Sequence, residues 1–254
     1  IYIYPGQYQE AFPMTVPQGV TIQGDRIRGV EIYPTSATQS NDAFLVNSDV
    51  TIENITLKDY YYNSGANTGY GFRFVNNFST TIFEQEPGRS PYIRNVTVLT
   101  KGTTTSASDP RGFAAGDAGK GALVDGQVVA SNSRSASMLF HSCTFITPGV
   151  DGLTITNGVR VEWLNSFTYF ANRGIYMSQG SAGRTTPEAT TVYGGELRTI
   201  ASANVYGNKG IEADGANCLA YMINQNFAYI GSGKNVTNDN TTTIQTNEVI
   251  ELNK

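Results

Sequence analysis

A short sequence repeat constrains the fold of this chain more than any other feature. Each copy reads apolar, any residue, Asn or Ser, apolar, any residue, large or apolar. By subtraction of their positions, the Asn and Ser residues lie 23, 18, 47, 24, 38 and 22 residues apart, and the short intervals cluster near twenty-two. The copies are Ile52–Leu57, Val75–Phe78, Ile93–Val98, Phe140–Phe145 and Leu164–Tyr169, with weaker copies at Asn204–Val205 and Asn226–Phe227. The two long intervals are those expected where a coil is skipped or expanded.

A second repeat lies upstream of several of these copies and reads Gly or Ala, apolar, any residue, apolar. Its copies start at Ala43, Gly71, Gly152, Gly174 and Gly210, with a further candidate at Gly121. Alternation with a period of two is typical of a strand that buries one face. Short strands at this spacing bury that face only when successive coils stack in parallel, roughly 4.8 Å apart. The sequence therefore predicts an all-β fold, a single-stranded right-handed parallel β-helix with insertions between coils.

Stacked coils also bring the Asn and Ser positions of the first repeat together at one corner. Side-chain amides in such a column donate hydrogen bonds to the coil above or below. We therefore expect structural roles for Asn54, Asn77, Asn95 and Asn226.

Composition narrows the classes of function. The formal net charge is −4 and Lys and Arg form no cluster, so no nucleic-acid partner is expected. No apolar run approaches the roughly 20 residues that span a bilayer, so we expect no membrane insertion. The chain holds two cysteines, Cys143 and Cys218, and one histidine, His141, too few for a four-thiolate or a His-rich metal site. We expect both cysteines in the core, and neither a metal nor another cofactor.

The chain is expected to form a single domain over residues 1–254. Residues 100–122 are small, polar and rich in Gly and Ser, which predicts an excursion between coils. Residues 232–247 are predicted to be a loop or an exit linker. The chain begins inside a strand-like run, IYIYPGQYQE, and an uncapped coil would present unpaired strand edges. We therefore expect it to be a fragment of a longer polypeptide.

The opening stretch, IYIYPGQYQEAFPMTVPQGVTIQG, resembles the first coil of pectin-lyase-like β-helix proteins, a likeness that concerns fold more than function. Four other stretches resemble the β-helix region of virion structural proteins from tailed phages of marine cyanobacteria. They are SPYIRNVTVLTKGTTTSASDPRGF, AGDAGKGALVDGQVV, VEWLNSFTYFANRGIYM and SANVYGNKGIEADGANCLAYMINQNFAYIG. The resemblance covers nearly the whole chain. It implies a tail fibre, tailspike or related adsorption component in the phage tail, with other virion proteins and host cell-surface polysaccharide as partners, and it leaves a homotrimer open.

Signature motifs of pectin esterases, polygalacturonases and pectate lyases are absent from the sequence. A phage-type polysaccharide depolymerase has no fixed motif, so it stays open as an alternative function, as does a bacterial surface adhesin. The favoured interpretation is not an enzyme but a rigid scaffold for recognising host-surface glycans.

Strand alternation nominates the candidate site residues. The outward positions of the second repeat include Arg73, Tyr176, Glu212 and Asp214, which we expect to contact glycans. Glu212 and Asp214 are two apart on one strand, so their Cα atoms should lie about 6.5 to 7 Å apart on one face. Inverting glycosidases use carboxylate pairs roughly 6.5 to 9.5 Å apart, so this pair would be catalytic in a depolymerase. An outward Glu-x-Asp is more often a solvated face that discourages edge aggregation.

Overall fold

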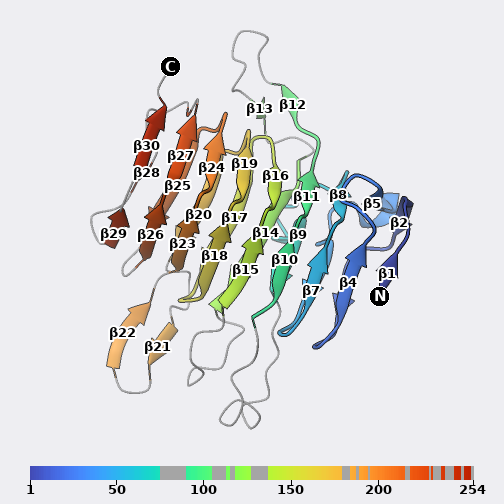
Figure 1. Ribbon diagram of the computed structural model, residues 1–254, viewed down its shortest axis with the longest axis horizontal. Helices are drawn as coiled ribbons and strands as arrows, with labels where there is room; N and C mark the ends of the chain where they lie inside the picture. The colour runs from blue at the N-terminus through green and yellow to red at the C-terminus, as the bar shows by residue number, and fades with distance from the viewer. Residues whose placement is uncertain are drawn as a thin grey trace.

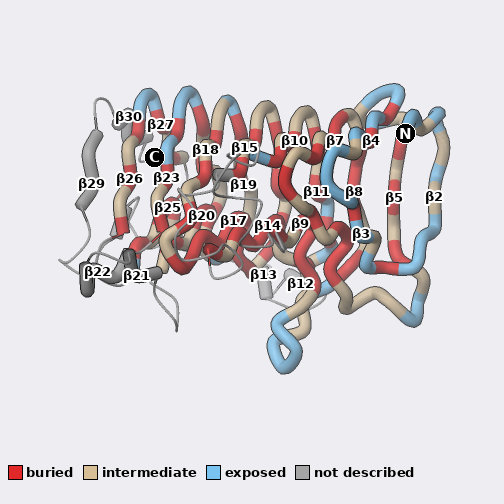
Figure 2. The backbone as a smooth tube through the Cα atoms, turned by 90° about the horizontal axis from the view of Figure 1, so that it is seen from below, coloured by how far each residue is buried: buried red, intermediate tan, exposed pale blue. Residues whose placement is uncertain are grey.

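The computed structural model describes residues 1–74, 90–104, 113–114, 118–126, 137–178, 184–186, 189–193, 195–214, 218–228, 230, 236–237, 243–246 and 249–252. Over these residues the chain winds into stacked coils that contribute short strands to three parallel sheets, A, B and C (Figures 1 and 2). The first eight coils supply one strand to each sheet, and the described part of the last coil supplies strands to sheets A and B. The prediction of an all-β parallel β-helix is confirmed. Across the described residues no helix is long and apolar enough to cross a membrane.

Successive coils supply successive strands to each sheet. Sheet A contains β1 (Tyr2–Ile3), β4 (Thr21–Gly24), β7 (Thr51–Glu53), β10 (Tyr92–Arg94), β15 (Ser137–His141), β18 (Arg160–Leu164), β23 (Glu196–Ile200), β26 (Leu219–Ile223) and β29 (Thr243–Thr246). Sheet B contains β2 (Gly6–Glu10), β5 (Val30–Pro34), β8 (Thr56–Lys58), β11 (Thr97–Leu99), β16 (Thr144–Ile146), β19 (Phe167–Tyr169), β24 (Ala203–Val205), β27 (Gln225–Ala228) and β30 (Val249–Leu252).

Sheet C forms the back of the molecule in Figure 1 and its lower side in Figure 2. It contains β3 (Met14–Val16), β6 (Phe44–Val46), β9 (Tyr70–Phe74), β14 (Lys120–Asp125), β17 (Asp151–Thr156), β20 (Arg173–Ser178), β25 (Lys209–Asp214) and β28 (Val236–Thr237). A 3-10 helix spans Ser36–Thr38, and two antiparallel pairs project from the coils: β12 (Thr103–Thr104) with β13 (Phe113–Ala114), and β21 (Arg184–Thr186) with β22 (Ala189–Tyr193).

Apolar residues of consecutive coils stack in columns inside the solenoid. In sheet A, Ile93 pairs with Phe140, and Phe140 pairs with Trp163. The Trp163 ring centroid lies 5.4 Å from that of Phe140 and 5.0 Å from that of Phe145 in sheet B, and all three side chains are fully buried. Burial of each such side chain contributes roughly 1.5–3 kcal/mol, so these aromatic layers tie sheets A and B together.

The corner between sheets A and B holds the predicted Asn and Ser column. Asn54 and Asn95 both have positive φ (59° and 51°), and Asn95 Nδ2 donates to Asn54 Oδ1 at 3.2 Å. In the next coils Ser142 and Asn165 take the same left-handed conformation, which Asn adopts more readily than most residues, and Asn165 Nδ2 donates to Ser142 Oγ at 3.1 Å. The ladder is therefore confirmed for Asn54 and Asn95, whereas Asn77 lies outside the described residues.

Two coils carry the repeat in a different register from the one predicted. Trp163 pairs with Thr199 and Thr168 pairs with Asn204, so the corner residue of the latter coil is Ala201, and Asn204 points into the core. In the next coil the corner is Asn224, and the predicted ladder residue Asn226 lies one position into β27. The expectation for Asn226 was wrong, because the left-handed corner residue of that coil lies two positions earlier, at Asn224, and leaves Asn226 on the strand.

The register in the copy at Leu164–Tyr169 was also wrong by one residue. Asn165, not Ser166, occupies the corner, and Ser166 stacks inside the solenoid, where its Oγ accepts a hydrogen bond from the Cys143 backbone N–H at 3.0 Å. Cys143 and Cys218 are both buried in the core, as predicted.

Close approach of neighbouring coils explains the glycine that opens the second repeat. A Cβ on Gly121 would lie 2.2 Å from the carbonyl oxygen of Gly152, and one on Gly152 would lie 2.5 Å from that of Gly174. Real Cβ atoms do not approach a carbonyl oxygen so closely, so these strands of sheet C can lie this close together only with glycine at these two positions. The candidate copy at Gly121 is therefore a true member of the repeat.

Both segments predicted to be irregular contain strands of the solenoid. Lys120–Asp125 form β14 of sheet C, so the excursion predicted at 100–122 ends before residue 120. Within the predicted exit linker at 232–247, Val236–Thr237 pair with β25 and Thr243–Thr246 pair with β26. This second prediction was wrong because β-branched residues, here Val236, Thr243 and Ile244, suit a strand even in a segment that is otherwise polar.

Candidate functional site

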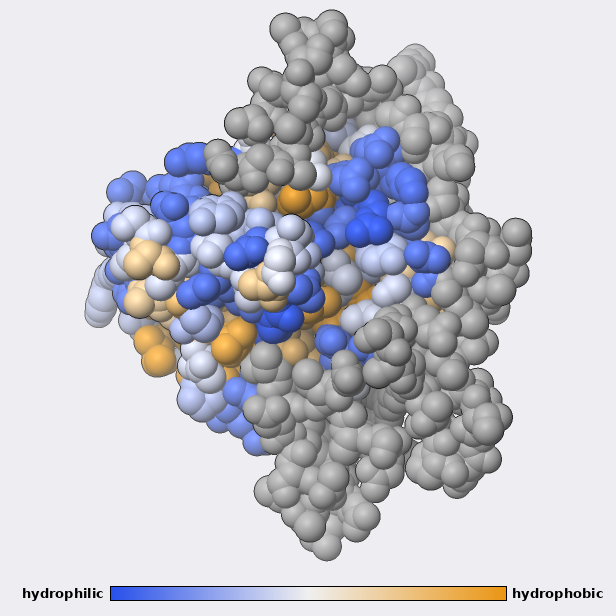
Figure 3. Space-filling view, turned by 180° about the vertical axis from the view of Figure 1, so that it is seen from behind, coloured by the Kyte–Doolittle hydropathy of each residue, from blue (hydrophilic) through white to orange (hydrophobic). Residues whose placement is uncertain are grey.

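A column of outward-facing polar residues crosses sheet C, one from each of five consecutive coils. Each residue precedes a glycine of the second repeat, so its side chain points away from the core. In stacking order they are Tyr70, Lys120, Asp151, Arg173 and Lys209. Figure 3 looks onto this side of the molecule, where groups of strongly hydrophilic side chains lie beside apolar ones.

Asp151 is the central charge of this column. Its side chain is only 4% exposed, and it accepts hydrogen bonds from Arg173 Nε at 2.6 Å and from Arg173 Nη2 at 2.8 Å. Lys120 Nζ lies 2.9 Å from Asp151 Oδ2 on the other side. Burial acts to raise the pKa of Asp151, but the Arg173 hydrogen bond and the charges of Lys120 and Arg173 outweigh it and hold the pKa below its ordinary value. Asp151 is therefore ionised and locked between two cations.

Each of these cations also stacks on a tyrosine ring. Lys120 Nζ lies 3.9 Å from the centroid of Tyr62, and the Arg173 guanidinium carbon lies 3.6 Å from that of Tyr176. Cation–π contacts of this kind hold an aromatic ring in place at a partly exposed surface. Burial, followed by the charge of Asp214, raises the pKa of Tyr176, so its hydroxyl stays protonated and donates to Asp214 Oδ2 at 3.2 Å.

At the other end of the column, Tyr62 and Tyr70 form an edge-to-face pair with centroids 5.6 Å apart. Both hydroxyl groups donate to Asn67 Oδ1, each at 3.0 Å. Burial raises the pKa of Tyr70 well above its ordinary value, so this phenol is a neutral hydrogen-bonding group and not a base.

A groove of about 380 Å³ lies between these aromatic ends. It is lined by side chains of β9, β14, β17 and β20, of the segment before β9 and of Asn157 just after β17. The lining residues are Tyr62, Asn67, Tyr70, Lys120, Leu123, Asp125, Asp151, Thr154, Thr156, Asn157, Arg173, Tyr176 and Ser178. Apart from Leu123, every lining side chain carries a polar group.

Two of the buried polar atoms in this lining have no protein partner. They are Thr154 Oγ1 and Asn157 Oδ1, on residues that are 8% and 3% exposed. The Asn157 amide is oriented by its Nδ2, which donates to Asp125 Oδ1 at 2.6 Å. Buried polar atoms are normally paired, so a molecule that hydrogen-bonds these two atoms from the groove would supply the partners that the described protein atoms do not.

The structure brings three of the four predicted site residues together. Tyr176, Glu212 and Asp214 all face outward on adjacent strands of sheet C, with Tyr176 stacked on Glu212 in register. Glu212 is ion-paired with Lys209 and lies 3.4 Å from Arg173 Nη1. It therefore stands beside the groove and outside its lining.

Arg73, the fourth predicted residue, is engaged elsewhere. Its guanidinium makes a bidentate ion pair with Asp42, which is 5% exposed, and also donates to the carbonyl oxygen of Asn67. Asp42 in turn accepts hydrogen bonds from the Gly69 and Tyr70 backbone N–H groups, both at 3.0 Å. Arg73 thus anchors the segment before β9, and through it Tyr70.

Sequence reasoning missed most of the groove. Lys120 and Asp151 are not among the predicted site residues, because the outward positions that the repeat predicts follow its glycine, whereas these two residues precede it. The signal was present, since the residues before Gly121, Gly152 and Gly174 alternate in charge as Lys, Asp and Arg. In the described part of the chain, no group of three His, Cys, Asp or Glu side chains is placed to hold a metal ion.

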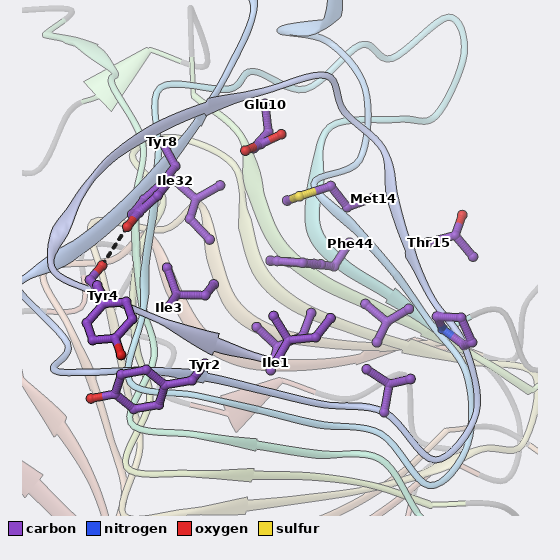
Figure 4. A pocket seen from close by; sticks show the side chains of 14 residues that line it. Ile1, Tyr2, Ile3, Tyr4, Tyr8, Glu10, Met14, Thr15, Ile32 and Phe44 are labelled. Atoms are coloured by element: carbon purple, nitrogen blue, oxygen red, sulfur yellow. Dashed lines mark hydrogen bonds between the residues drawn. The ribbon is translucent and has the colours of Figure 1, made fainter.

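A second cavity, of about 480 Å³, lies at the first coil (Figure 4). Its lining is mostly apolar and includes Ile3, Met14 and Phe44, and Tyr8 Oη donates to the carbonyl oxygen of Tyr4 at 2.7 Å. Because this lining offers few hydrogen-bonding groups, the groove on sheet C is the stronger candidate for a functional site.

Comparison with known proteins gives no family assignment. No family model matches the chain, and no curated protein matches it. Among solved structures, the chain is similar to the mannuronan C-5 epimerase AlgE6 A-module of Azotobacter vinelandii, with 12% sequence identity and a TM-score of 0.35 over 98% of this chain and 70% of that one. At this identity and TM-score we base no statement about the site on the match.

Proposed function

We propose that the chain recognises a glycan through the groove on sheet C. The observation that carries this proposal is a polar groove that ends in tyrosine rings and stands on the outside of a rigid sheet. Ligand sites typically combine aromatic surface with a few fixed polar groups, and a sugar presents both an apolar C–H face and hydroxyl groups to such a lining. The cations stacked on Tyr62 and Tyr176 hold both rings before a ligand arrives.

We further propose that this recognition serves a phage particle, with the chain as part of a tail fibre, tailspike or related adsorption component. The sequence likeness to virion β-helix proteins supports this role. So does the architecture, because coils that contact their neighbours through continuous parallel sheets make a stiff rod. Under this proposal the partners are other virion proteins, in a homotrimer or another arrangement, and polysaccharide on the host cell.

A depolymerase is the second candidate. Glu212 and Asp214 do lie side by side next to the groove, and Asp214 contacts Tyr176 at its edge. The contacts of Glu212 weigh against a catalytic role, since its carboxylate is already bound by Lys209 and lies 3.4 Å from Arg173 Nη1. We therefore favour binding without cleavage.

A pull-down on envelope polysaccharide of marine cyanobacteria, with an assay for new reducing ends or unsaturated products, tests the proposal. Tyr176→Ala should reduce retention of the protein. Tyr221→Ala is the matched control, because Tyr221 also carries a stacked cation, Arg198 at 5.0 Å, but lies on sheet A. Equal retention of both variants would refute the groove as the site. Cleavage that is lost in Glu212→Gln would make the protein a depolymerase.

A further inference from the structure

We propose that the groove on sheet C is built for a neutral, hydroxyl-rich saccharide and not for an acidic one. This inference rests on the glycan-binding function proposed above and adds the class of ligand. It follows from how the charges of the groove are already used and from which hydrogen-bonding atoms are left over.

The cations of the described lining are committed to the protein's own carboxylate. Lys120 and Arg173 both bind Asp151, and the lining holds Asp125 as a second acid, so two positive and two negative side chains balance. An acidic sugar would have to compete for Lys120 and Arg173 with a carboxylate that is 4% exposed and held by short hydrogen bonds. Displacing it would leave Asp151 buried without its partners, which is strongly unfavourable.

The two unpaired atoms of the lining, Thr154 Oγ1 and Asn157 Oδ1, can both accept a hydrogen bond from a ligand. Asn157 Oδ1 can only accept, and its orientation is fixed by the bond from Asn157 Nδ2 to Asp125. Ionised carboxylate, sulfate and phosphate groups carry no proton to donate, whereas every free sugar hydroxyl does. Thr154 Oγ1 can accept from or donate to such a hydroxyl. A hydroxyl group can therefore pair with both atoms, whereas an ionised group could accept from Thr154 Oγ1 but would leave Asn157 Oδ1 without a donor.

The dimensions of the groove suit an extended ligand that runs along the solenoid axis. Tyr62 follows β8 in the third coil and Tyr176 lies on β20 of the sixth. Three coil spacings of about 4.8 Å separate them, which is roughly 14 Å. Thr154, on β17 of the fifth coil, lies between the two rings along this direction. The site can thus hold a short oligosaccharide with its hydroxyl groups over Thr154.

The test uses envelope polysaccharide of marine cyanobacteria, separated by anion exchange into a neutral and an acidic fraction. Calorimetric titration of the 254-residue protein with each fraction, at low and raised NaCl, gives affinity and salt dependence. We expect binding of the neutral fraction with an affinity that salt leaves unchanged, since ionic contacts alone are screened. Thr154→Val should weaken this binding roughly three- to tenfold, the worth of one hydrogen bond. Thr144→Val, on the outer side of sheet B, is the control and should change nothing.

Other outcomes separate the two proposals. Binding of the acidic fraction alone, weakened by salt and by Tyr176→Ala, would overturn the neutral ligand and leave the groove as a glycan site. No binding of either fraction would overturn the glycan-binding function together with this inference. Binding of the neutral fraction that Thr154→Val leaves unchanged would also refute the assignment of its hydroxyl contacts.

Discussion

A pair of identical substitutions, Thr154→Val and Thr168→Val, should change stability in opposite directions. Both threonines are buried, at 8% and 2% exposure, and valine replaces a hydroxyl with a methyl group of nearly the same size. Thr154 Oγ1 has no hydrogen-bond partner, whereas Thr168 Oγ1 accepts a hydrogen bond from Asn204 Nδ2 at 2.6 Å. The two sites therefore differ in whether a hydrogen bond is lost.

The magnitudes follow from that difference. Burying a hydroxyl group without a partner costs about 1–3 kcal/mol in proteins, so its removal in Thr154→Val should raise the free energy of unfolding by about 1 kcal/mol. In Thr168→Val the Asn204 amide loses its acceptor inside the core, which should lower the free energy of unfolding by about 1–3 kcal/mol. The variants should therefore differ by about 2–4 kcal/mol.

Equilibrium unfolding in guanidinium chloride, followed by circular dichroism under identical conditions, measures this difference through the unfolding midpoints. Thr154→Val should unfold at a higher denaturant concentration than the wild type and Thr168→Val at a lower one. A loss of stability in Thr154→Val as large as that in Thr168→Val would refute the reasoning. It would mean that the Thr154 hydroxyl is already satisfied in the free protein and is not kept for a ligand.

Three further substitutions and treatments probe the column, the corner and the core. Asp151→Asn should lower the free energy of unfolding by about 3–5 kcal/mol, because it removes the buried carboxylate that binds both Lys120 and Arg173. Denaturant titration measures this loss, with Asp125→Asn as the control. Folding lowers the pKa of Asp151, so its contribution to the free energy of unfolding is complete above the ordinary carboxyl pKa and is lost as the pH falls through the lower folded pKa. In Asp151→Asn the free energy of unfolding should therefore fall less steeply at acid pH than in the wild type. An unchanged acid pH dependence would contradict the ion pair. Ala201→Asn should raise the free energy of unfolding by about 1 kcal/mol, because Ala201 has a φ of 50°, a left-handed conformation that Asn tolerates better than Ala. Thermal unfolding measures this change, and a lower melting temperature would argue against the corner geometry. Burial raises the pKa of the Cys143 thiol to about 12, so a thiol reagent at pH 8 should label it only after unfolding, and rapid labelling of the folded protein would contradict its burial.

The fold was predictable because each coil of the solenoid repeats the same pattern of inward and outward residues in the sequence. The repeats predict strands whose inward residues stack from coil to coil. The structure pairs these residues as expected: Phe44 pairs with Phe72, and Ile52 pairs with Ile93. The register failed at Asn204 because Asn suits both the corner and a polar stretch of the core. There its amide bonds Thr168 and Gln225 side chains, contacts that sequence spacing does not reveal.

The candidate site was predictable only in part. Strand alternation correctly placed Tyr176 and Glu212 on the outer face of sheet C. It did not identify Asp151 as the central charge, because Lys120 and Asp151 meet only when the excursion before β14 is correctly assigned. Tyr62 could not be predicted either, since it lies outside the repeats in the segment between β8 and β9, and Arg73 and Asp42 set the position of that segment.

The most direct test of the central claim is a crystal structure of the protein soaked with a short oligosaccharide released from the retained polysaccharide. The account predicts sugar density over sheet C between Tyr62 and Tyr176, with a hydroxyl group within hydrogen-bond distance of Thr154 Oγ1 or Asn157 Oδ1. Density over the outer faces of sheets A or B, or in the apolar cavity beside Ile3, with the sheet C groove empty, would contradict it.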